Sequence, residues 1–333
     1  MDLTMVLIVI IVILALGFDF INGFHDTANA IATSISTRAL TPRAAIILAS
    51  LMNLLGAILF TGVAKTIGGK VADPFKLHHG LTVVIATLVA AILWNLITWW
   101  RGIPSSSSHA LIGALAGAVV ASEGWHGVNY SGFSSIVMGL VFSPIIAFAL
   151  GFIIMFILKY AFAYASPHPV NKVFRKCQWV TAAFQSFTHG TNDAQKAMGI
   201  ITMALVVGGF QSTLDVALWV KIAAAASMAL GTSLGGWKII KTMGTKIFKI
   251  EPINGFAADL SSASVILGAT LTHFPVSTTH AITSSILGVG SAKKFSSVRW
   301  NVAGRIVVTW IITIPIVAVL AAAIYAVLRL FLP

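Results

Sequence analysis

Long apolar segments joined by short polar loops make up almost the whole chain, and this feature limits the fold more than any other. Hydrophobic residues account for 58% of the 333 residues and charged residues for only 9%, whereas a soluble domain carries about 25% charged residues. The segments lack the alternation of outer-membrane strands, so each is predicted to be a helix that satisfies its own backbone in lipid. The sequence therefore predicts an all-α integral membrane protein, a multi-pass helical bundle.

The charge balance fits that prediction. The chain has 21 basic and 9 acidic residues, for a net charge of +12. Most basic residues stand in short loops, where they set topology and contact anionic lipid. We therefore expect no nucleic-acid partner. Cys177 is the single cysteine, which excludes an intramolecular disulfide and a multi-cysteine metal site.

A polar stretch within the first apolar segment recurs in the second half. Residues 20–33 (FINGFHDTANAIAT) and 187–200 (FTHGTNDAQKAMGI) align with a shift of 167 positions, which places Asp26 on Asp193. Such polar groups are costly in lipid unless they line a cavity or bind a ligand. Two copies half a chain apart predict two structural repeats that meet at one site.

Two further matches support an internal duplication. Residues 103–110 match 274–281 with a shift of 171 positions, and residues 65–68 match 241–244 with a shift of 176. The three matches keep their order along the chain. We expect a first inverted repeat over 1–158, a cytoplasmic linker over 159–176 and a second inverted repeat over 177–333.

The charges of equivalent loops predict that the repeats are inverted. The loop at 38–43 is basic while its counterpart at 208–215 has no Lys or Arg, and the loop at 122–132 has none while its counterpart at 291–299 is basic. Opposite bias at equivalent positions places them on opposite faces. The loop pair at 65–80 and 241–250 is basic in both halves and does not contribute. The expected cytoplasmic loops are 38–43, 159–176, 241–250 and 291–299, with both termini extracellular in the cell membrane.

Segment lengths predict broken or re-entrant helices. A straight helix over 3–36 would span about 50 Å at 1.5 Å per residue, against a hydrocarbon core of about 30 Å, so we expect a break near Gly23. Residues 81–122 contain Pro104 and only a short apolar run after it, which predicts a re-entrant or broken pair. Further helices are expected over 44–64, 133–160, 216–240 and 302–330, while the segments 178–208 and 255–290 contain the second copies of the two motifs.

The duplicated aspartates are candidate cation ligands. A single buried Asp is as often a helix–helix hydrogen bond as a ligand, but two in duplicated motifs favour binding. Carboxylate, amide and hydroxyl oxygens suit a hard cation such as Na⁺. The expected Na⁺ ligands are Asp26, Asp193, Asn22, Asn29, Thr27 and Asn192.

The two Pro-x-Ser-(Ser/Thr)-(Ser/Thr)-His motifs are candidate anion sites. After a proline break they offer hydroxyl groups and the free N–H groups of a new helix, whose dipole favours an anion. The alternative is a serine-rich helix cap without a ligand. The expected anion ligands are Ser106, Ser107, Ser108, Ser277, Thr278, Thr279 and Gln195.

Three polar residues in these motifs have two possible roles each. His109 and His280 either donate to the anion or bond a carbonyl inside the bundle. Lys196 lies one turn beyond Asp193, where the first repeat has Asn29. Its ammonium either pairs with that carboxylate or binds an anion.

These motifs resemble those of the inorganic phosphate transporter (PiT) family, its prokaryotic branch especially. The resemblance rests on residues 21–30 (INGFHDTANA), 188–193 (THGTND) and 275–280 (PVSTTH), and it covers nearly the whole chain. It implies cation-coupled uptake of inorganic phosphate by alternating access, with no enzymatic activity and no cofactor besides Na⁺ as the coupling ion. Where eukaryotic members carry an acid, this chain has Asn53, so an acid-pair role does not transfer to that position.

Several functions compete with Na⁺ symport at this stage. The family also includes H⁺-coupled members and carriers of metal–phosphate complexes. A passive anion channel would not need carboxylates, and a membrane-embedded phosphotransferase would need a basic cluster or metal site that no motif offers. The expected partners are inorganic phosphate, sodium ions and the lipid bilayer, with a homodimer as one form of assembly.

Overall fold

The computed structural model describes residues 2–77 and 79–332, which form helices and loops with one isolated β-bridge between Ala72 and Val128. The first half contains α1 (Leu3–His25), α2 (Thr27–Ser36), α3 (Pro42–Leu59), α4 (Gly62–Lys70), the 3₁₀ turn η1 (Pro74–Lys76), α5 (Gly80–Arg101), α6 (Ser107–Glu123), the 3₁₀ turn η2 (Trp125–Gly127) and α7 (Tyr130–Ala161). The second half contains α8 (Pro167–Val207), α9 (Leu218–Leu234), α10 (Trp237–Lys241), the π-helical turn η3 (Thr242–Lys246), α11 (Pro252–Leu271), α12 (Thr278–Lys294), the 3₁₀ turn η4 (Phe295–Ser297) and α13 (Trp300–Leu328). The all-α fold is thus confirmed.

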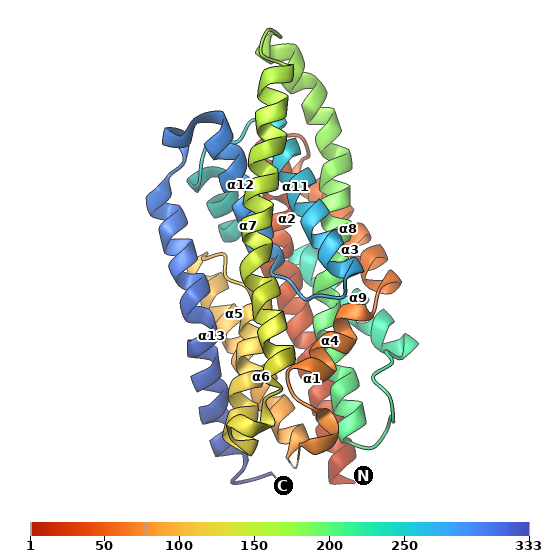
Figure 1. Cartoon of the computed structure of the whole chain (residues 1–333). Helices are drawn as coiled ribbons and strands as arrows, with labels where there is room; N and C mark the ends of the chain where they lie inside the picture. Colours follow the sequence, from red (N-terminus) through yellow and green to blue (C-terminus); the bar gives the residue numbers. More distant parts are fainter. Residues whose placement is uncertain (1, 78, 333) are drawn as a thin grey trace.

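The two halves present corresponding elements in the same order but in opposite directions. Helix α7 rises from the end of the molecule that carries both termini, whereas its counterpart α13 descends toward that end (Figure 1). Likewise α1 rises from the N-terminus and α8 descends from the far end. The molecule is therefore a bundle of two inverted repeats, as predicted.

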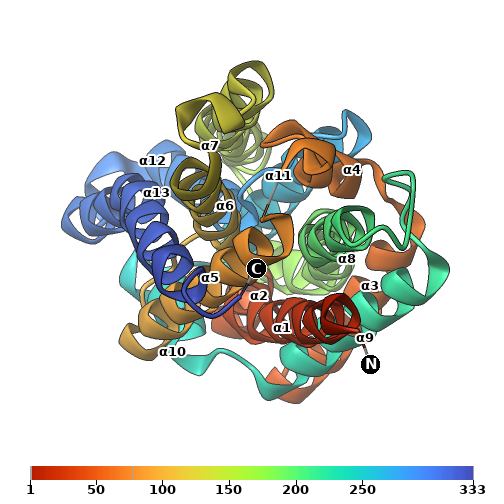
Figure 2. The ribbon, with the colours of Figure 1, turned by 90° about the horizontal axis from the view of Figure 1, so that it is seen from below.

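The C-terminal part of helix α8 is enclosed by neighbouring helices. Viewed along the bundle, it is surrounded by α1, α3, α4, α9 and α11, all of which contact it (Figure 2). The polar residues of the second motif consequently lie in the interior, and residues 188–204 of this helix are all buried. This burial removes the motif from lipid, which an isolated polar helix would contact at high cost.

Two helix pairs are re-entrant. Helix α5 rises from the termini-bearing end, the chain turns at Gly102–Ser106, and α6 returns to the same end (Figure 1). Helices α11 and α12 form the equivalent pair from the opposite end. The two turns meet inside the bundle, where the Ser108 hydroxyl donates to the Val276 carbonyl at 2.8 Å. The predicted re-entrant pair over 81–122 is therefore present.

Glycines in the duplicated motifs let helices of opposite repeats approach closely. A Cβ atom on Gly23 would collide with the backbone of α9 at Met228, and one on Gly190 would collide with the backbone of α3 at Asn53. The packing is reciprocal, because α9 and α3 are themselves equivalent helices. In each case the motif of one repeat packs against a helix of the other repeat, Gly23 against α9 and Gly190 against α3.

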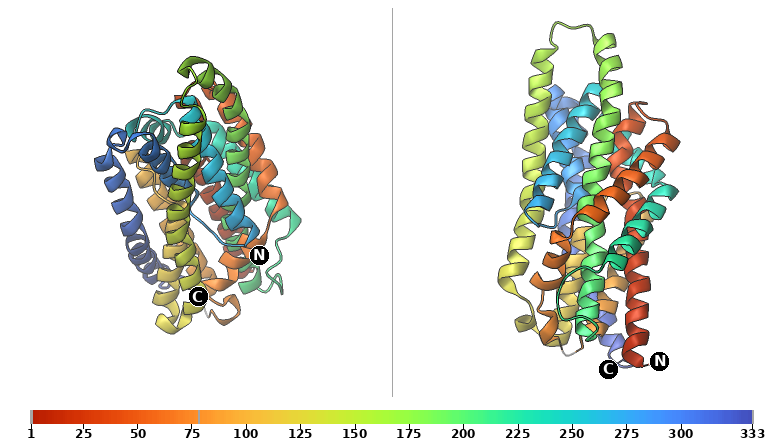
Figure 3. Two further views of the ribbon diagram at one scale, coloured as in Figure 1. Left: turned by 45° about the horizontal axis from the view of Figure 1, so that its top comes forward. Right: turned by 90° about the vertical axis from the view of Figure 1, so that its right-hand side faces the viewer.

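The exterior is apolar over the height of the bundle. Five helices are long and apolar enough to cross a membrane within the described residues, or six if α9 and the bent segment Trp237–Lys246 form one span. Outward side chains such as Ile13 and Val319 are strongly exposed. The termini lie together at one end, and the α7–α8 hairpin projects at the other (Figure 3).

Several boundaries differ from the sequence predictions. The segment expected as one helix over 44–64 is divided into α3 and α4, and the one expected over 216–240 is divided into α9 and α10. The first helix is interrupted at Asp26, not near Gly23, and only slightly, because Asp26 keeps helical angles of φ −89° and ψ −35°. The expected linker over 159–176 is mostly helical, since α7 runs to Ala161 and α8 begins at Pro167. Proline is tolerated in a first helical turn, where its missing N–H is not needed.

Candidate functional site

Asp26 lies at the interruption between α1 and α2 and is buried. Its Oδ1 atom is 2.6 Å from His25 Nδ1 and accepts a hydrogen bond from the Thr279 hydroxyl at 3.1 Å. Its Oδ2 atom accepts from the Ser107 hydroxyl. Because Thr279 comes from α12 and Ser107 from α6, donors of both repeats converge on this carboxylate.

Asp193 occupies the equivalent place on α8 and is fully buried. Its Oδ1 atom is 2.7 Å from the Lys196 ammonium. Its Oδ2 atom lies 3.3 Å from His189 Nε2 and accepts hydrogen bonds from Asn22 Nδ2 at 3.3 Å and the Thr278 hydroxyl at 3.1 Å. Again donors of both repeats meet one carboxylate.

Ser107 and Asn22 join the two aspartates into one cluster. The Ser107 hydroxyl, which contacts Asp26, is also 3.0 Å from Asn22 Oδ1 and accepts from the Lys196 ammonium at 3.1 Å. Asn22 and Lys196 in turn contact Asp193. Two carboxylates, one ammonium and several neutral oxygens therefore share one water-poor site.

At the start of each re-entrant helix, two successive side chains have different roles: the first caps the helix and the second donates a hydrogen bond to an aspartate. The hydroxyls of Ser106 and Ser277 accept from the backbone N–H groups of His109 and His280, which is the N-cap role. The next residues, Ser107 and Thr278, donate to Asp26 and Asp193 respectively.

The third hydroxyls of the two motifs differ. Thr279 donates to Asp26 and accepts from Asn29 Nδ2 at 2.9 Å, whereas Ser108 holds the opposite turn through the Val276 carbonyl. The hydroxyls of these motifs that contact the two carboxylates are thus those of Ser107, Thr278 and Thr279.

Three residues expected at the site lie elsewhere. The Thr27 hydroxyl accepts from Asn53 Nδ2 at 3.0 Å. Asn192 holds the second re-entrant turn, donating to the Phe274 carbonyl at 3.2 Å, and Gln195 accepts from the backbone N–H of Ala64 at 3.0 Å. Each of these side chains orders a helix end or turn around the site.

Helical spacing explains which neighbours reach the carboxylates. Side chains three or four positions away share a face, while those one or two positions away do not. For Asp193 the first rule selects His189 and Lys196, and both contact it. Asn192 and Gln195 do not meet that rule, and their side chains contact the Phe274 carbonyl and the Ala64 N–H group instead.

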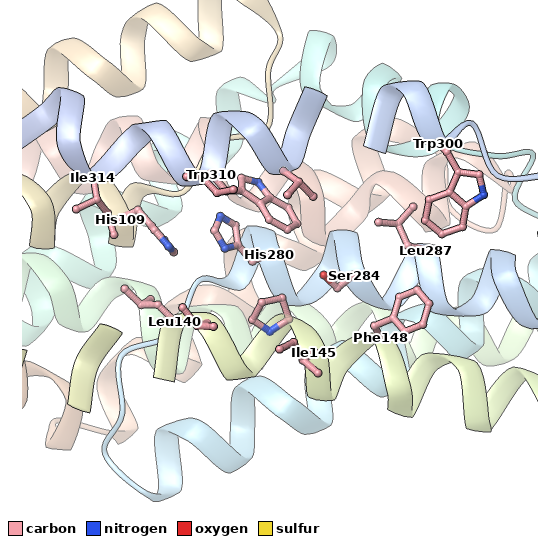
Figure 4. Close-up of a pocket in the computed structure, with 14 residues that line it drawn as sticks. His109, Leu140, Ile145, Phe148, His280, Ser284, Leu287, Trp300, Trp310 and Ile314 are labelled. Carbon is pink, nitrogen blue, oxygen red and sulfur yellow. The ribbon is translucent and has the colours of Figure 1, made fainter. Parts of the chain in front are cut away.

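The two histidines face away from the aspartates. His109 Nδ1 is 2.9 Å from the Ser106 hydroxyl, and the rings of His109 and His280 lie 4.3 Å apart. Trp310 stacks on His280 at 3.8 Å. These rings and apolar side chains of α7, α12 and α13 line a cavity of about 590 Å³ (Figure 4). Among the described residues neither ring bonds a carbonyl, because His109 contacts the Ser106 hydroxyl and His280 Nε2 has no hydrogen-bond partner.

Comparison with known proteins identifies relatives along the whole chain. The sequence pattern described as "Phosphate transporter family" matches residues 22–321. A Bacillus subtilis (strain 168) protein named "Probable low-affinity inorganic phosphate transporter" is 58% identical over 331 residues, covering 99% of each chain. A Rhizobium meliloti (strain 1021) protein of the same name is 45% identical, covering 98% of each chain.

A solved structure described as "The sodium-dependent phosphate transporter" has the same fold. Its TM-score is 0.86 and its sequence identity 27%, over 98% of this chain and all of that chain. These relatives are transporters and not enzymes, so the phosphotransferase alternative is set aside.

Proposed function

Since the chain belongs to the phosphate transporter family, we propose that it carries inorganic phosphate into the cell together with Na⁺, by alternating access. The observation that carries this proposal is the shared cluster of Asp26 and Asp193 at the meeting point of two re-entrant turns. The solved relative is itself described as sodium-dependent. Inverted repeats around a central site are the usual architecture for alternating access.

The charges of the cluster give a reason for coupling. Two like charges 4 Å apart repel by about 4 kcal/mol at an effective dielectric constant of 20, so phosphate cannot approach bare carboxylates closely. A cation between them turns repulsion into attraction, and each ion then strengthens binding of the other. The carboxylate oxygens, Asn22 Oδ1 and the neighbouring hydroxyls form a ligand set suited to Na⁺.

The anion would bind at the start of the two re-entrant helices. The hydroxyls of Ser107, Thr278 and Thr279 reach into the cluster, and the free N–H groups of α6 and α12 add donors and a favourable dipole. Ser106 and Ser277 keep these helix starts in place as caps.

Lys196 would link the cation to the anion. Its ammonium contacts both Asp193 and the Ser107 hydroxyl. A Na⁺ ion that binds Asp193 competes with this ammonium and frees it to turn toward phosphate. The same residue then serves as the partner of the carboxylate when the site is empty and of the anion when it is full.

Orientation follows from the charges of the loops. The basic loops at 38–43 and 291–299 lie at the end opposite the termini (Figure 1). Placing this end in the cytoplasm puts both termini outside, at the cell surface from which phosphate is taken up. Inward Na⁺ then gains about 2.3 kcal/mol per charge per 100 mV of membrane potential.

Uptake of phosphate into proteoliposomes tests this function. A Na⁺ gradient alone should drive accumulation, and a pH gradient alone should not. Accumulation driven only by the pH gradient would assign H⁺ as the coupling ion, and a requirement for divalent metal would assign a metal–phosphate cargo. Passive equilibration that ignores both gradients would contradict symport and favour a channel.

A further inference from the structure

A second cavity, of about 510 Å³, lies between the end of α3, the start of α4 and the turn after α11. Its described lining includes three basic side chains, those of Lys65, Lys70 and His273, and contains no carboxylate. An oxyanion is the ligand that this lining suits, because it meets three basic side chains, and the carboxylate nearby, that of Asp215, is paired with the Lys65 ammonium.

His273 has an unusual backbone conformation, and the internal repeat reveals its meaning. Its φ angle is +61°, and the equivalent residue in the first repeat is Gly102, with φ +64°. The same bond marks both turns, since Thr66 donates to the His273 carbonyl at 2.8 Å and Thr242 donates to the Gly102 carbonyl at 3.1 Å. Glycine adopts this conformation freely, whereas another residue is strained by about 1–3 kcal/mol.

A residue other than glycine strains the backbone at this position, so its presence indicates that the side chain has a role. The imidazole of His273 packs at the start of α4, where a Cβ atom on Gly62 would collide with the ring. This arrangement places the ring at the wall of the cavity, and His273 is exposed. The strain therefore holds an imidazole in the same space as the two ammonium groups.

The cavity adjoins the central site through a short stretch of chain. After His273 the chain passes through Phe274 and Val276, both of which are held by Asn192, and it reaches Thr278, which donates to Asp193. The Lys70 ammonium lies 5.4 Å from the centre of the Phe274 ring. The wall of the cavity is thus the second re-entrant turn itself.

The surroundings indicate that the cavity contains water. The chain is not helical between α3 and α4, and such backbone is tolerated at membrane depth only when protein or water covers it. Lys65 is half exposed, which lipid would oppose. Its ammonium is 2.5 Å from Asp215, and these contacts lower the pKa of the Asp215 carboxyl. Exposed pairs of this kind contribute little, so an anion can replace the carboxylate.

We propose that Lys65, Lys70 and His273 form a docking site in which a phosphate ion is held before it passes the second re-entrant turn to the central site. The inference rests on the proposed function, because it takes phosphate as the transported ion. It also implies that the end bearing the termini faces the source of phosphate. Basic groups in a concave site raise the local anion concentration and so act mainly on entry.

The sharpest test replaces His273 by the residue that the first repeat has. His273→Gly relieves the strained backbone, so thermal stability in detergent should stay equal or rise. The KM for phosphate uptake into proteoliposomes should nevertheless rise by about threefold or more, with kcat changed by less than about twofold. Lys70→Gln should act the same way and should flatten the dependence of KM on ionic strength.

Lys76→Gln is the matched control. Lys76 is a strongly exposed lysine that pairs with Asp73 and does not line this cavity, so this variant should keep the wild-type KM. A second measurement uses Thr272→Cys in a Cys177→Ser background, where inorganic phosphate should slow labelling by a water-soluble thiol reagent and chloride should not.

Unchanged KM and salt dependence in both His273→Gly and Lys70→Gln, or labelling of Thr272→Cys that phosphate does not slow, would overturn the docking site. Failure of the unaltered protein to take up phosphate would instead contradict the proposed function. The two results are distinct, because the first pair of variants is compared within an active transporter.

Discussion

Replacing Lys196 by methionine should test the charge balance of the central cluster most directly. The ammonium lies 2.7 Å from Asp193 Oδ1, and both side chains are buried, with exposed fractions of 1% and 0%. Removing one partner of a buried ion pair costs about 3–5 kcal/mol, because the other charge remains without compensation. Asn22 and Thr278 still donate to Asp193, so we expect about 3 kcal/mol, or more than a hundredfold in the unfolding equilibrium.

A double-mutant cycle separates the ion pair from the two side chains. Asp193→Asn and Lys196→Met should each destabilise the protein, while the double variant should lose less than the sum, with a coupling energy of about 1–3 kcal/mol. Unfolding in detergent, followed by tryptophan fluorescence, measures all four proteins. Lys221→Met is the control, since Lys221 forms no ion pair among the residues that the structure describes.

Transport assays on the same variants separate folding from coupling. The double variant should lose less stability than the two single losses together and still fail to accumulate phosphate, because the carboxylate that we propose binds the cation is gone. Strictly additive losses of stability would show that Lys196 and Asp193 do not form the pair. Normal Na⁺-dependent uptake by Asp193→Asn would refute the role of this carboxylate in coupling.

Three further outcomes are expected. Asp26→Asn should abolish Na⁺-coupled uptake while leaving folding intact, because the amide keeps an acceptor for the hydroxyl donors; retained Na⁺ dependence would exclude Asp26 as a ligand. Ser107→Ala should raise the KM for phosphate about tenfold to a hundredfold, the effect of losing 1.5–3 kcal/mol of hydrogen bonding to a charged ligand, whereas the exposed Ser264→Ala should not. Gly190→Ala should lower stability by about 1–3 kcal/mol through contact with α3; Gly304→Ala, which has open space, measures the background.

Much of the fold could be predicted because the two halves of the chain repeat the same motifs and can be compared with each other. Duplicated motifs located equivalent elements, and the short apolar run after Pro104 revealed the re-entrant pair. The first and last residues of the helices were harder to predict from the sequence. The sequence did not show that α8 begins at Pro167. Proline is common both in loops and in the first turn of a helix, so its presence does not distinguish the two.

The convergence of the two aspartates could be expected for the same reason, whereas the contacts of their neighbours along the chain depend on helix geometry. Asp26 and Asp193 were found because both copies of the motif contain them. Thr27 and Gln195 stand near an aspartate in sequence, but along a continuous helix a side chain one or two residues away points to another face. The interruption at Asp26 is the exception, because there the adjacent His25 does reach the carboxylate. Contacts between repeats, such as that of Thr279 with Asp26, required the three-dimensional arrangement.

The two carboxylates occupy equivalent positions in the two repeats, but their surroundings differ in charge. Position 29 in the first repeat is an asparagine that donates to Thr279, whereas its counterpart in the second repeat is Lys196, which pairs with Asp193. Within the described part of the chain, Asp26 therefore has hydroxyl and imidazole partners but no lysine or arginine. A cation gains more at Asp26, because at Asp193 it must first displace an ammonium. We therefore expect Asp26 to bind the first cation, and the second cation to be the one that releases Lys196 toward phosphate.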